Sequence, residues 1–184
     1  MRCAWRCPRV AGEDGWTLME TMVVTSIIAI LTGIAVPQFA AIGTQMRTNT
    51  GANQVLTDIE YARVMAQRTG VAHYIETTGG TGVNYRVMRV AVPPEAGPQV
   101  VRTSSLGSKL PGVVFAQNGS TTDCFGTTAT QATPTALLSF NARGLPSAAT
   151  SYFVGSNDGT NSYVVSVSGA GRVRLCRNVG GTWH

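Results

Sequence analysis

One segment near the N-terminus limits what this chain can fold into. No charged residue occurs between Thr21 and Met46, and residues 16–36 are largely apolar apart from the carboxylate of Glu20. At about 1.5 Å of rise per residue, a helix over residues 16–36 is roughly 31 Å long, which is enough to cross the hydrocarbon core of a bilayer. The sequence therefore predicts one membrane-spanning helix with a single carboxylate near its start.

The residues before this segment are basic and have no apolar stretch of their own. Arg2, Arg6 and Arg9 precede the span, and the next basic residue is Arg47. The positive-inside rule therefore predicts a cytoplasmic N-terminus and a folded domain on the other side of the membrane. Because residues 1–15 contain no apolar region, they differ from an ordinary secretory signal peptide. We expect a short leader that precedes the span.

The carboxylate of Glu20 needs a partner, because a charged group inside an apolar segment costs about 2.5 to 3.5 kcal/mol on insertion scales. No cation lies within one helical turn of Glu20 in the intact chain. Cleavage after Gly15 would create a positively charged α-amine at Trp16, one turn away, and a neighbouring subunit would offer the same amine. We expect Glu20 to pair with such an amine.

The segment Gly15-Trp16-Thr17-Leu18-Met19-Glu20 resembles the class III signal of type IV pilins and type II secretion pseudopilins. The short leader, the glycine before the cut and the glutamate at the fifth mature position all match. The resemblance implies that a prepilin peptidase cuts after Gly15 and methylates the new N-terminus at Trp16, and that Glu20 neutralises this amine during filament assembly. Pro37 lies at the family's usual helix kink. A plain single-span anchor with an incidental glutamate is the alternative, but it does not explain the leader, the glycine and the spacing together.

Beyond Pro37 the apolar side chains keep a helical period. They recur at spacings of four, three and four residues, with Leu56 beside them, at Val55, Ile59, Ala62 and Ala66. We expect this stripe to pack on a sheet. The polar residues Asp58, Glu60 and Gln67 fall outside the stripe, and Gly70 supplies a C-terminal stop. The pattern predicts one interrupted helix from about residue 16 to residue 69.

The remainder of the chain has β-like patterning. Short apolar or β-branched runs, separated by turn residues, cover residues 71–77, 85–92, 99–103, 112–116, 136–140, 162–167 and 172–176. Residues 117–135 are rich in Thr, Gly and Ser and form a predicted long loop that carries Cys124. Charged residues make up only 12 % of the chain, which is more typical of a strand-rich extracytoplasmic protein than of a helical cytosolic enzyme.

Three further segments resemble the GspH/FimT group of minor pilins and pseudopilins, namely Asp58–Arg63, Leu138–Gly144 and Gly171–Cys176. The resemblance implies an α+β fold in which a long N-terminal transmembrane pilin helix packs on an antiparallel, β-rich globular head of two sheets. It also implies a place near the tip or the priming complex of a pilus-like filament.

On this interpretation the chain has four parts: a leader (1–15), the transmembrane half of the helix (16–36), its amphipathic half (37–70) and the head (71–184). The protein would be a single-pass protein of the bacterial inner membrane with a cytoplasmic N-terminus and a periplasmic head. Its expected partners are other pilins or pseudopilins and the prepilin peptidase.

Two arginines share one side of the last predicted strand. In strand alternation the side chains of Arg172 and Arg174 lie on the same face, roughly 7 Å apart, which is about two phosphate steps of one DNA strand. Arg177 adds a third cation, and the net charge of +5 favours acidic partners. The segment Gly171-Arg172-Val173-Arg174 also resembles the G-R-x-R motif of FimT-type pilins, which implies that Gly171, Arg172 and Arg174 bind DNA during uptake for natural transformation. The alternative is a solvated edge strand whose arginines block aggregation.

The four cysteines fall into two groups. Only Cys124 and Cys176 are candidates for a disulfide, because Cys3 and Cys7 lie in the leader. Cys176 falls on the arginine face by strand alternation, so this bridge would hold the loop of residues 117–135 beside the two arginines. A bridge that closes about 50 residues stabilises the fold by roughly 4 kcal/mol in the chain-entropy model.

No residue pattern indicates catalysis or metal binding. The two histidines, His73 and His184, have no metal-ligand spacing to a cysteine or carboxylate, and no nucleophile elbow, phosphate loop or paired-carboxylate motif occurs. We therefore expect a subunit that is not an enzyme and that needs no cofactor. Three functions stay open: a DNA-binding minor pilin of a type IV pilus, a type II secretion pseudopilin that touches secreted protein cargo, and a minor pilin that serves filament initiation or adhesion.

Overall fold

The computed structural model describes residues 17–77, 84–115, 123–126, 130–131, 138–157, 159, 162–179 and 182–184. The predicted leader, with Gly15, and the predicted first mature residue, Trp16, lie outside the described residues. The described residues up to Ala40 belong to one compact unit, and those from Ala41 onward belong to a second. Helix α1, Leu18–Thr69, contributes to both units.

Thr17 caps the start of helix α1. The backbone amide of Glu20 donates to Oγ1 of Thr17 at 3.3 Å, and the amides of Glu20 and Thr21 donate to the carbonyl oxygen of Thr17. A threonine is favoured here because its hydroxyl accepts from an amide that has no partner inside the helix. The helix begins at Leu18 and continues through Pro37 without the interruption that the sequence predicts.

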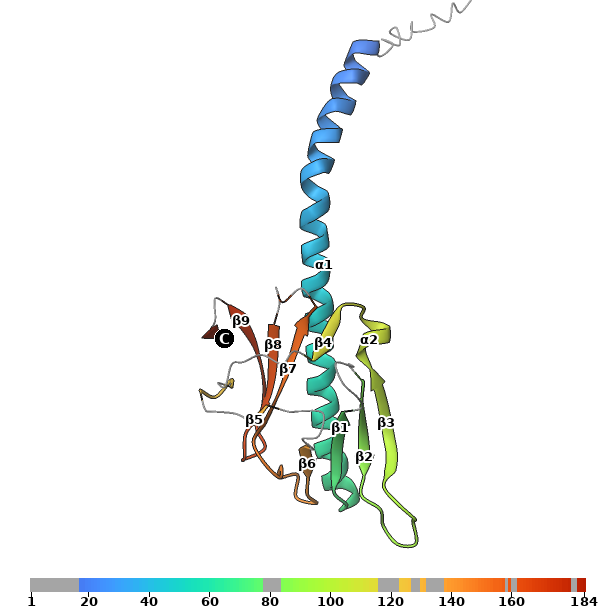
Figure 1. Ribbon diagram of the computed structural model, residues 1–184, viewed down its shortest axis with the longest axis vertical. Helices are drawn as coiled ribbons and strands as arrows, with labels where there is room; N and C mark the ends of the chain where they lie inside the picture. The colour runs from blue at the N-terminus through green and yellow to red at the C-terminus, as the bar shows by residue number, and fades with distance from the viewer. Residues whose placement is uncertain are drawn as a thin grey trace, which may run out of the picture. The chain divides into compact units, whose positions relative to one another are not determined.

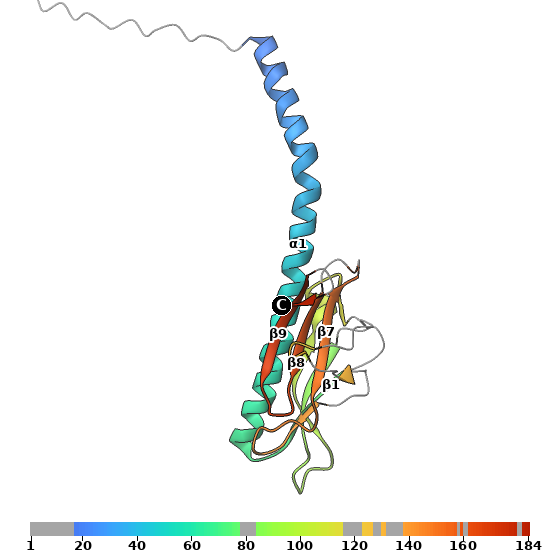
Figure 2. The same cartoon turned by 90° about the vertical axis from the view of Figure 1, so that its left-hand side faces the viewer.

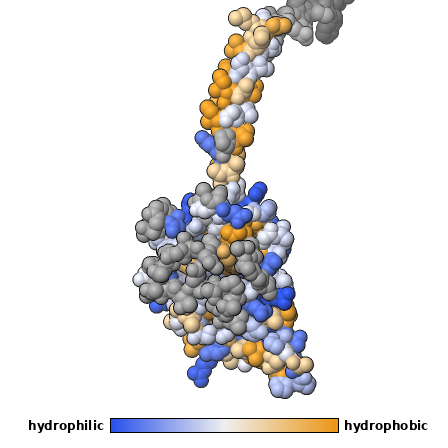
Figure 3. Space-filling view, in the orientation of Figure 1, coloured by the Kyte–Doolittle hydropathy of each residue, from blue (hydrophilic) through white to orange (hydrophobic). Residues whose placement is uncertain are grey.

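Within the first unit, almost every described side chain of α1 is exposed and most are apolar (Figure 3). The hydroxyl groups in this stretch donate to carbonyl oxygens of the helix itself at 2.7 to 2.9 Å, at Thr21, Thr25, Ser26 and Thr32. Such bonds give a hydroxyl an acceptor within its own helix, as is needed where no water is present. Among the described residues, α1 is the one helix that is long and apolar enough to cross a membrane.

Two sheets make up most of the second unit (Figure 1). The first has the strand order β3-β2-β1-β6 and consists of β1 (His73–Thr77), β2 (Asn84–Arg89), β3 (Gln99–Ser105) and β6 (Leu138–Phe140). The second has the order β10-β9-β8-β7-β4, with β5 also on β7, and consists of β4 (Val113–Phe115), β5 (Thr130–Gln131), β7 (Thr150–Ser156), β8 (Ser162–Val167), β9 (Val173–Val179) and β10 (Thr182–Trp183). A short helix, α2 (Leu106–Lys109), lies between β3 and β4. All pairs are antiparallel except β5 with β7, which confirms the predicted two-sheet antiparallel head.

Strand β7 has no counterpart among the predicted strands, although it lies between β8 and β4 in the second sheet. Figure 2 shows β7 beside β8. Every residue of β7 is buried. Its sequence lacks a continuous apolar run because Ser151, Gly155 and Ser156 interrupt it. The structure accommodates Ser151 by pairing its hydroxyl with that of Ser166 on β8, at 3.0 Å. Buried hydroxyl groups that bond to each other are tolerated in a core strand. The short elements β5, β10 and α2 were likewise not predicted from the sequence.

The predicted stripe on α1 lies at the centre of the core. Its four residues are buried as predicted, and Ala52, one turn earlier, extends it. The stripe belongs to one apolar cluster with side chains of both sheets, among them Ile75, Tyr85, Val87, Phe140, Tyr152, Val154, Val165 and Val167. The helix ends at the predicted Gly70, which has a φ of 67° and whose amide donates to the carbonyl oxygen of Ala66 at 3.0 Å.

The helical period places Asp58 outside the buried stripe, but the structure shows its side chain fully buried. The buried face of α1 is therefore wider than the sequence predicts. Oδ2 of Asp58 accepts hydrogen bonds from the hydroxyls of Tyr85 at 2.6 Å and Ser104 at 2.7 Å, and Nη1 of Arg102 lies 3.0 Å from Oδ1 of Asp58. The guanidinium of Arg102 also lies 5.8 Å from the ring centroid of Tyr61 on the same helix. Burial and the adjacent carboxylate raise the pKa of the Tyr85 phenol, which keeps it a donor. This network joins α1 to β2 and β3.

Candidate functional site

A tight turn precedes the arginine-bearing strand β9. The amide of Ser168 donates to the carbonyl oxygen of Arg172 at 2.9 Å, and the amide of Gly171 donates to the carbonyl oxygen of Ser168 at 2.7 Å. Gly171 has a φ of 78°, a left-handed conformation that other residues rarely adopt. The hydroxyl of Ser168 accepts from the amide of Arg172 at 3.1 Å. The chain therefore enters β9 at a defined angle, with both predicted arginines just after the turn.

The surroundings of Gly171 also leave little room for a side chain, because Gly171 is buried against two other parts of the head. A Cβ atom at this position would lie 3.3 Å from the carbonyl oxygen of Gly144 and 3.4 Å from Cδ of Pro146. Nη1 of Arg63, on α1, donates to the carbonyl oxygen of Gly171 at 2.6 Å. The glycine of the G-R-V-R segment thus positions the backbone of the strand.

The three segments that resemble GspH/FimT proteins meet at this point. Arg63 closes the first segment, Gly144 closes the second and Gly171 opens the third, and the contacts above join all three. Sequence separation hides this junction, since Arg63 and Gly171 are 108 residues apart. The three segments therefore contribute to one structural joint between α1 and two turns of the head.

Arg172 and Arg174 are both exposed; Arg172 directly precedes β9 and Arg174 is its second residue. The guanidinium of Arg174 lies 5.4 Å from the ring centroid of Phe125, a cation–π contact. Phe125 comes from a segment about 50 residues earlier and was not predicted to take part. Within the described residues there are two ion pairs, Arg89 with Glu95 and Arg102 with Asp58, so neither exposed arginine is neutralised by them.

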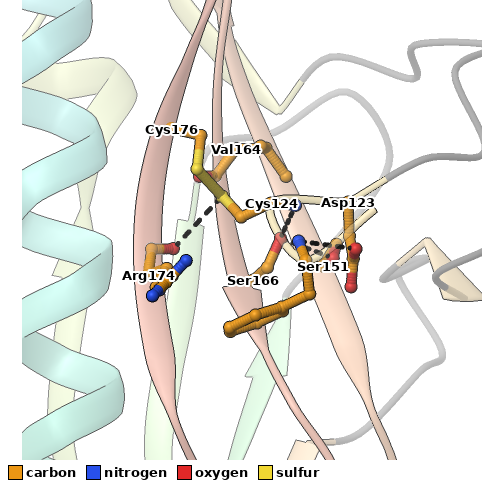
Figure 4. Close-up of a disulfide and its surroundings, with 8 residues drawn as sticks. Asp123, Cys124, Ser151, Val164, Ser166, Arg174 and Cys176 are labelled. Carbon is orange, nitrogen blue, oxygen red and sulfur yellow. Dashed lines mark hydrogen bonds between the residues drawn. A yellow bond between two sulfur atoms is a disulfide. The ribbon is translucent and has the colours of Figure 1, made fainter. Parts of the chain in front are cut away.

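The predicted disulfide between Cys124 and Cys176 is present, with 5.8 Å between the two α-carbons (Figure 4). It fixes the Cys124 segment on the outer side of β8 and β9. The amide of Cys124 donates to the hydroxyl of Ser166 at 3.2 Å, which itself accepts from the hydroxyl of Ser151. Of the predicted loop 117–135, residues 123–126 and 130–131 are described, and the remainder lies outside the described residues. The bridge thereby holds Phe125 beside Arg174.

Arg177 lies apart from the other two arginines. Strand alternation puts it on the opposite face of β9 from Arg174. The side-chain amide oxygen of Gln45 on α1, in the orientation that satisfies both groups, accepts from Nη1 and Nη2 of Arg177 at 3.0 and 3.1 Å. The backbone of Arg177 pairs with that of His184 in both directions, at 2.8 and 3.0 Å. The structure thus brings Arg172 and Arg174 together and leaves Arg177 on the side facing α1.

Glu20 is exposed in the first turn of α1. A carboxylate is favoured there because the helix dipole places partial positive charge at the N-terminus. Gly15 and Trp16, which the predicted cleavage and methylation involve, lie outside the described residues.

His73, which has no metal-ligand spacing in the sequence, is fully buried at the start of β1. Its Nδ1 lies 2.9 Å from the carbonyl oxygen of Val71. Among the residues that the structure describes, no three His, Cys, Asp or Glu side chains are grouped so that they could hold a metal ion.

Comparison with known proteins gives one family and a fold. The family model of the type II transport protein GspH matches residues 51–171. The minor pseudopilin EpsH of the Vibrio cholerae type 2 secretion system is similar in structure, with 12 % identity, a TM-score of 0.52, and coverage of 70 % of this chain and 95 % of that one. The type IV minor pilin FimU of Pseudomonas aeruginosa, in one crystal form, has 17 % identity, a TM-score of 0.50, and coverage of 74 % and 96 %. None of the curated proteins compared with the sequence matches it.

At these identities the two solved structures show a shared fold. The family match is broader evidence, because it covers well over half of the chain and includes the helix stripe, the whole first sheet, strands β4, β5, β7 and β8 of the second sheet, and Gly171. It ends at Gly171, directly before the two exposed arginines. The chain therefore belongs to the GspH family, and it is a minor pilin or pseudopilin, a structural subunit that assembles with other pilins in a filament and not an enzyme.

Proposed function

We propose that this chain is a DNA-binding minor pilin of a type IV pilus, and that Arg172 and Arg174 contact the phosphate backbone. The observation that carries the proposal is that these two guanidinium groups are exposed, lie two residues apart, and belong to neither ion pair of the described residues. Side chains at this spacing stand roughly 7 Å apart, which is about twice the rise per phosphate of one strand along the DNA helix axis.

The surroundings of the two arginines support this function because they limit the motion of the backbone at Arg172 and of the side chain of Arg174. Gly171 and its contacts fix the turn before Arg172, and the disulfide fixes Phe125 against Arg174. A side chain that is already ordered loses less conformational entropy when it binds. This order favours the proposal over the simpler alternative, in which the arginines only keep the strand from aggregating.

Two phosphate contacts give weak binding without sequence preference. Each contact contributes about 0.9 to the slope of log Kd against log salt concentration, so Arg172 and Arg174 together should contribute about 1.8. Effective binding would come from several subunits, or from partner pilins, acting on one DNA molecule.

Binding of fluorescently labelled duplex DNA to the full chain in detergent, over a series of KCl concentrations, tests the proposal. We expect the double variant Arg172→Gln/Arg174→Gln to lose most of the salt dependence and most of the affinity. Arg177→Gln is a matched control, because it removes the same charge from the other face of the same strand and should bind like the parent. Unchanged affinity and slope in the double variant would contradict the assigned site.

A second function is favoured by one observation, the description of the matching family as a type II transport protein. On this alternative the chain is a pseudopilin that caps or primes the secretion filament and touches secreted protein cargo, and the two arginines are surface charges. Deletion of the gene separates the two functions. Loss of DNA uptake with normal secretion supports the first, and loss of secretion with normal uptake supports the second.

We also propose how the N-terminus matures. Prepilin peptidase would cut after Gly15 and methylate Trp16, and Glu20 would pair with the new amine of its own or a neighbouring subunit, in a single-pass inner-membrane protein with a periplasmic head. The support is the position of Glu20 in the first turn of α1, within one turn of residue 16. Glu20→Gln should reach the membrane and be cleaved, yet enter filaments poorly. Normal incorporation of this variant would contradict the pairing.

A further inference from the structure

Two tight turns from distant parts of the chain meet beside β9. The first covers residues 141–145, within and just after the Leu138–Gly144 segment, and the second covers residues 168–172. They touch at Gly144 and Gly171, where the carbonyl oxygen of Gly144 would lie 3.3 Å from a Cβ atom on Gly171. Each of these glycines has an arginine next to it in the sequence, Arg143 and Arg172.

Hydrogen bonds from both backbone and side chains hold the first turn. The side-chain Oδ1 of Asn141 accepts from the amides of Arg143 at 2.9 Å and Leu145 at 3.1 Å. The amide of Asn141 donates to the carbonyl oxygen of Leu145 at 3.0 Å, and the amide of Gly144 donates to that of Asn141 at 2.8 Å. Nε2 of Gln67, on α1, donates to the carbonyl oxygen of Arg143 at 3.1 Å. The backbone of Arg143 is thus fixed, while its side chain is exposed.

The contact between the two glycines limits the distance between the two arginines. Adjacent α-carbons are about 3.8 Å apart along the chain, so the α-carbons of Arg143 and Arg172 lie within roughly 15 Å of each other. An arginine side chain extends several ångströms beyond its α-carbon. The three guanidinium groups of Arg143, Arg172 and Arg174 can therefore follow a single phosphate backbone across the two turns and onto β9.

The charges around the junction also favour an anion. Arg63 donates to Gly171 and so keeps a fixed positive charge beneath the second turn. Arg143 belongs to neither ion pair of the described residues. On α1, the carboxylate nearest to Arg63 in sequence is that of Glu60. It lies one turn before Arg63 and is exposed. By contrast, the guanidinium of Arg177 is bound to Gln45 on the other face of β9.

We propose that Arg143 is a third phosphate-binding residue, so that the DNA-binding surface runs from β9 onto the turn of residues 141–145 and does not extend along β9 to Arg177. This inference rests on the DNA-binding function proposed above. It assigns a binding role to Arg143 of the Leu138–Gly144 segment, which lies outside the G-R-V-R segment. The ligand is a nucleic-acid backbone contacted at three phosphates.

Salt titrations of DNA binding by the full chain in detergent, with labelled duplex as the probe, test the inference. Three contacts predict a slope of about 2.7, and Arg143→Gln should lower it to about 1.8 and weaken binding roughly five- to tenfold at 0.1 M salt. Arg143→Lys keeps the charge and should keep the slope. Arg86→Gln, on β2 opposite Glu76, is the matched control and should bind like the parent.

The outcomes separate the two proposals. If Arg172→Gln/Arg174→Gln lowers the slope while Arg143→Gln binds like Arg86→Gln, the third contact is refuted and the proposed function stands. If the double variant and Arg143→Gln both bind like the parent, the proposed function fails and this inference fails with it. If Arg143→Gln unfolds at the same thermal midpoint as the parent, a reduced salt slope of DNA binding reflects a lost contact and not a loss of folding. If Arg143→Lys shows the same reduced salt slope as Arg143→Gln, the charge-based role of Arg143 is overturned.

Discussion

Removal of the Asp58 carboxylate tests the account of how α1 is joined to the first sheet. In Asp58→Ala the hydroxyls of Tyr85 and Ser104, which donate to the carboxylate at 2.6 and 2.7 Å, stay buried without an acceptor. Each such group costs about 1 to 3 kcal/mol. The side chain of Arg102 is 46 % exposed and can turn to water, so it adds little. We expect the free energy of unfolding to fall by about 3 to 5 kcal/mol, as for other buried charge networks that lose one partner.

Urea unfolding of the full chain in detergent, followed by near-ultraviolet circular dichroism, measures this loss because the signal comes from the packed aromatic side chains. Glu60→Ala is the matched control, an exposed carboxylate two residues away on the same helix, and it should change stability by less than about 0.5 kcal/mol. A double-mutant cycle with Tyr85→Phe should give a coupling energy of about 1 to 3 kcal/mol. Additive effects, or an Asp58→Ala variant as stable as the control, would refute the network.

Three further predictions concern the head. Replacing Cys124 and Cys176 with serine should lower stability by about 4 kcal/mol, because the bridge joins residues 52 apart, and a variant as stable as the oxidised parent would contradict this. Gly171→Ala should destabilise the head by at least about 1 to 2 kcal/mol through its left-handed backbone, whereas Gly169→Ala, which has open space around it, should be nearly neutral; equal thermal midpoints would count against the turn. Burial, with a smaller contribution from the carboxylate beside it, raises the pKa of the Tyr85 phenol in the folded protein. The protonated phenol therefore contributes its full stabilisation below the pKa of tyrosine in the unfolded chain, near 10, and the free energy of unfolding falls above that pH by about 1.4 kcal/mol per pH unit. In Tyr85→Phe the free energy of unfolding should fall less steeply above pH 10 than in the parent. Equal pH dependence in the two proteins would contradict the raised pKa of Tyr85.

The periodic parts of the fold could be predicted from the sequence. The stripe from Val55 to Ala66 indicates the buried face of α1 because helical spacing repeats locally, and Gly70 marks its end for the same reason. The disulfide follows from counting cysteines and from strand alternation around Cys176. In each case the information lies within a few residues or in a choice among very few partners.

Other features depend on partners far along the chain. Asp58 is buried because its partners arrive from 27 and 46 residues away, and a helical period cannot reveal them. Strand β7 escapes prediction because its serines are satisfied across the sheet and not by their neighbours in sequence.

The candidate site shows the same division between local and distant information. Alternation indicates that Arg172 and Arg174 share a face. The three-dimensional structure is needed to show that Arg177, on the opposite face, contacts Gln45 of α1. It is also needed to show that Gly144 contacts Gly171 and so places Arg143 near Arg172.

Intact mass spectrometry of the protein extracted from membranes of its native host tests most directly whether the chain matures as a filament subunit. We predict a species that starts at Trp16 and carries a single N-terminal methyl group. An uncut chain that retains residues 1–15 in assembled filaments would contradict the proposed maturation and remove the amine that Glu20 is expected to bind.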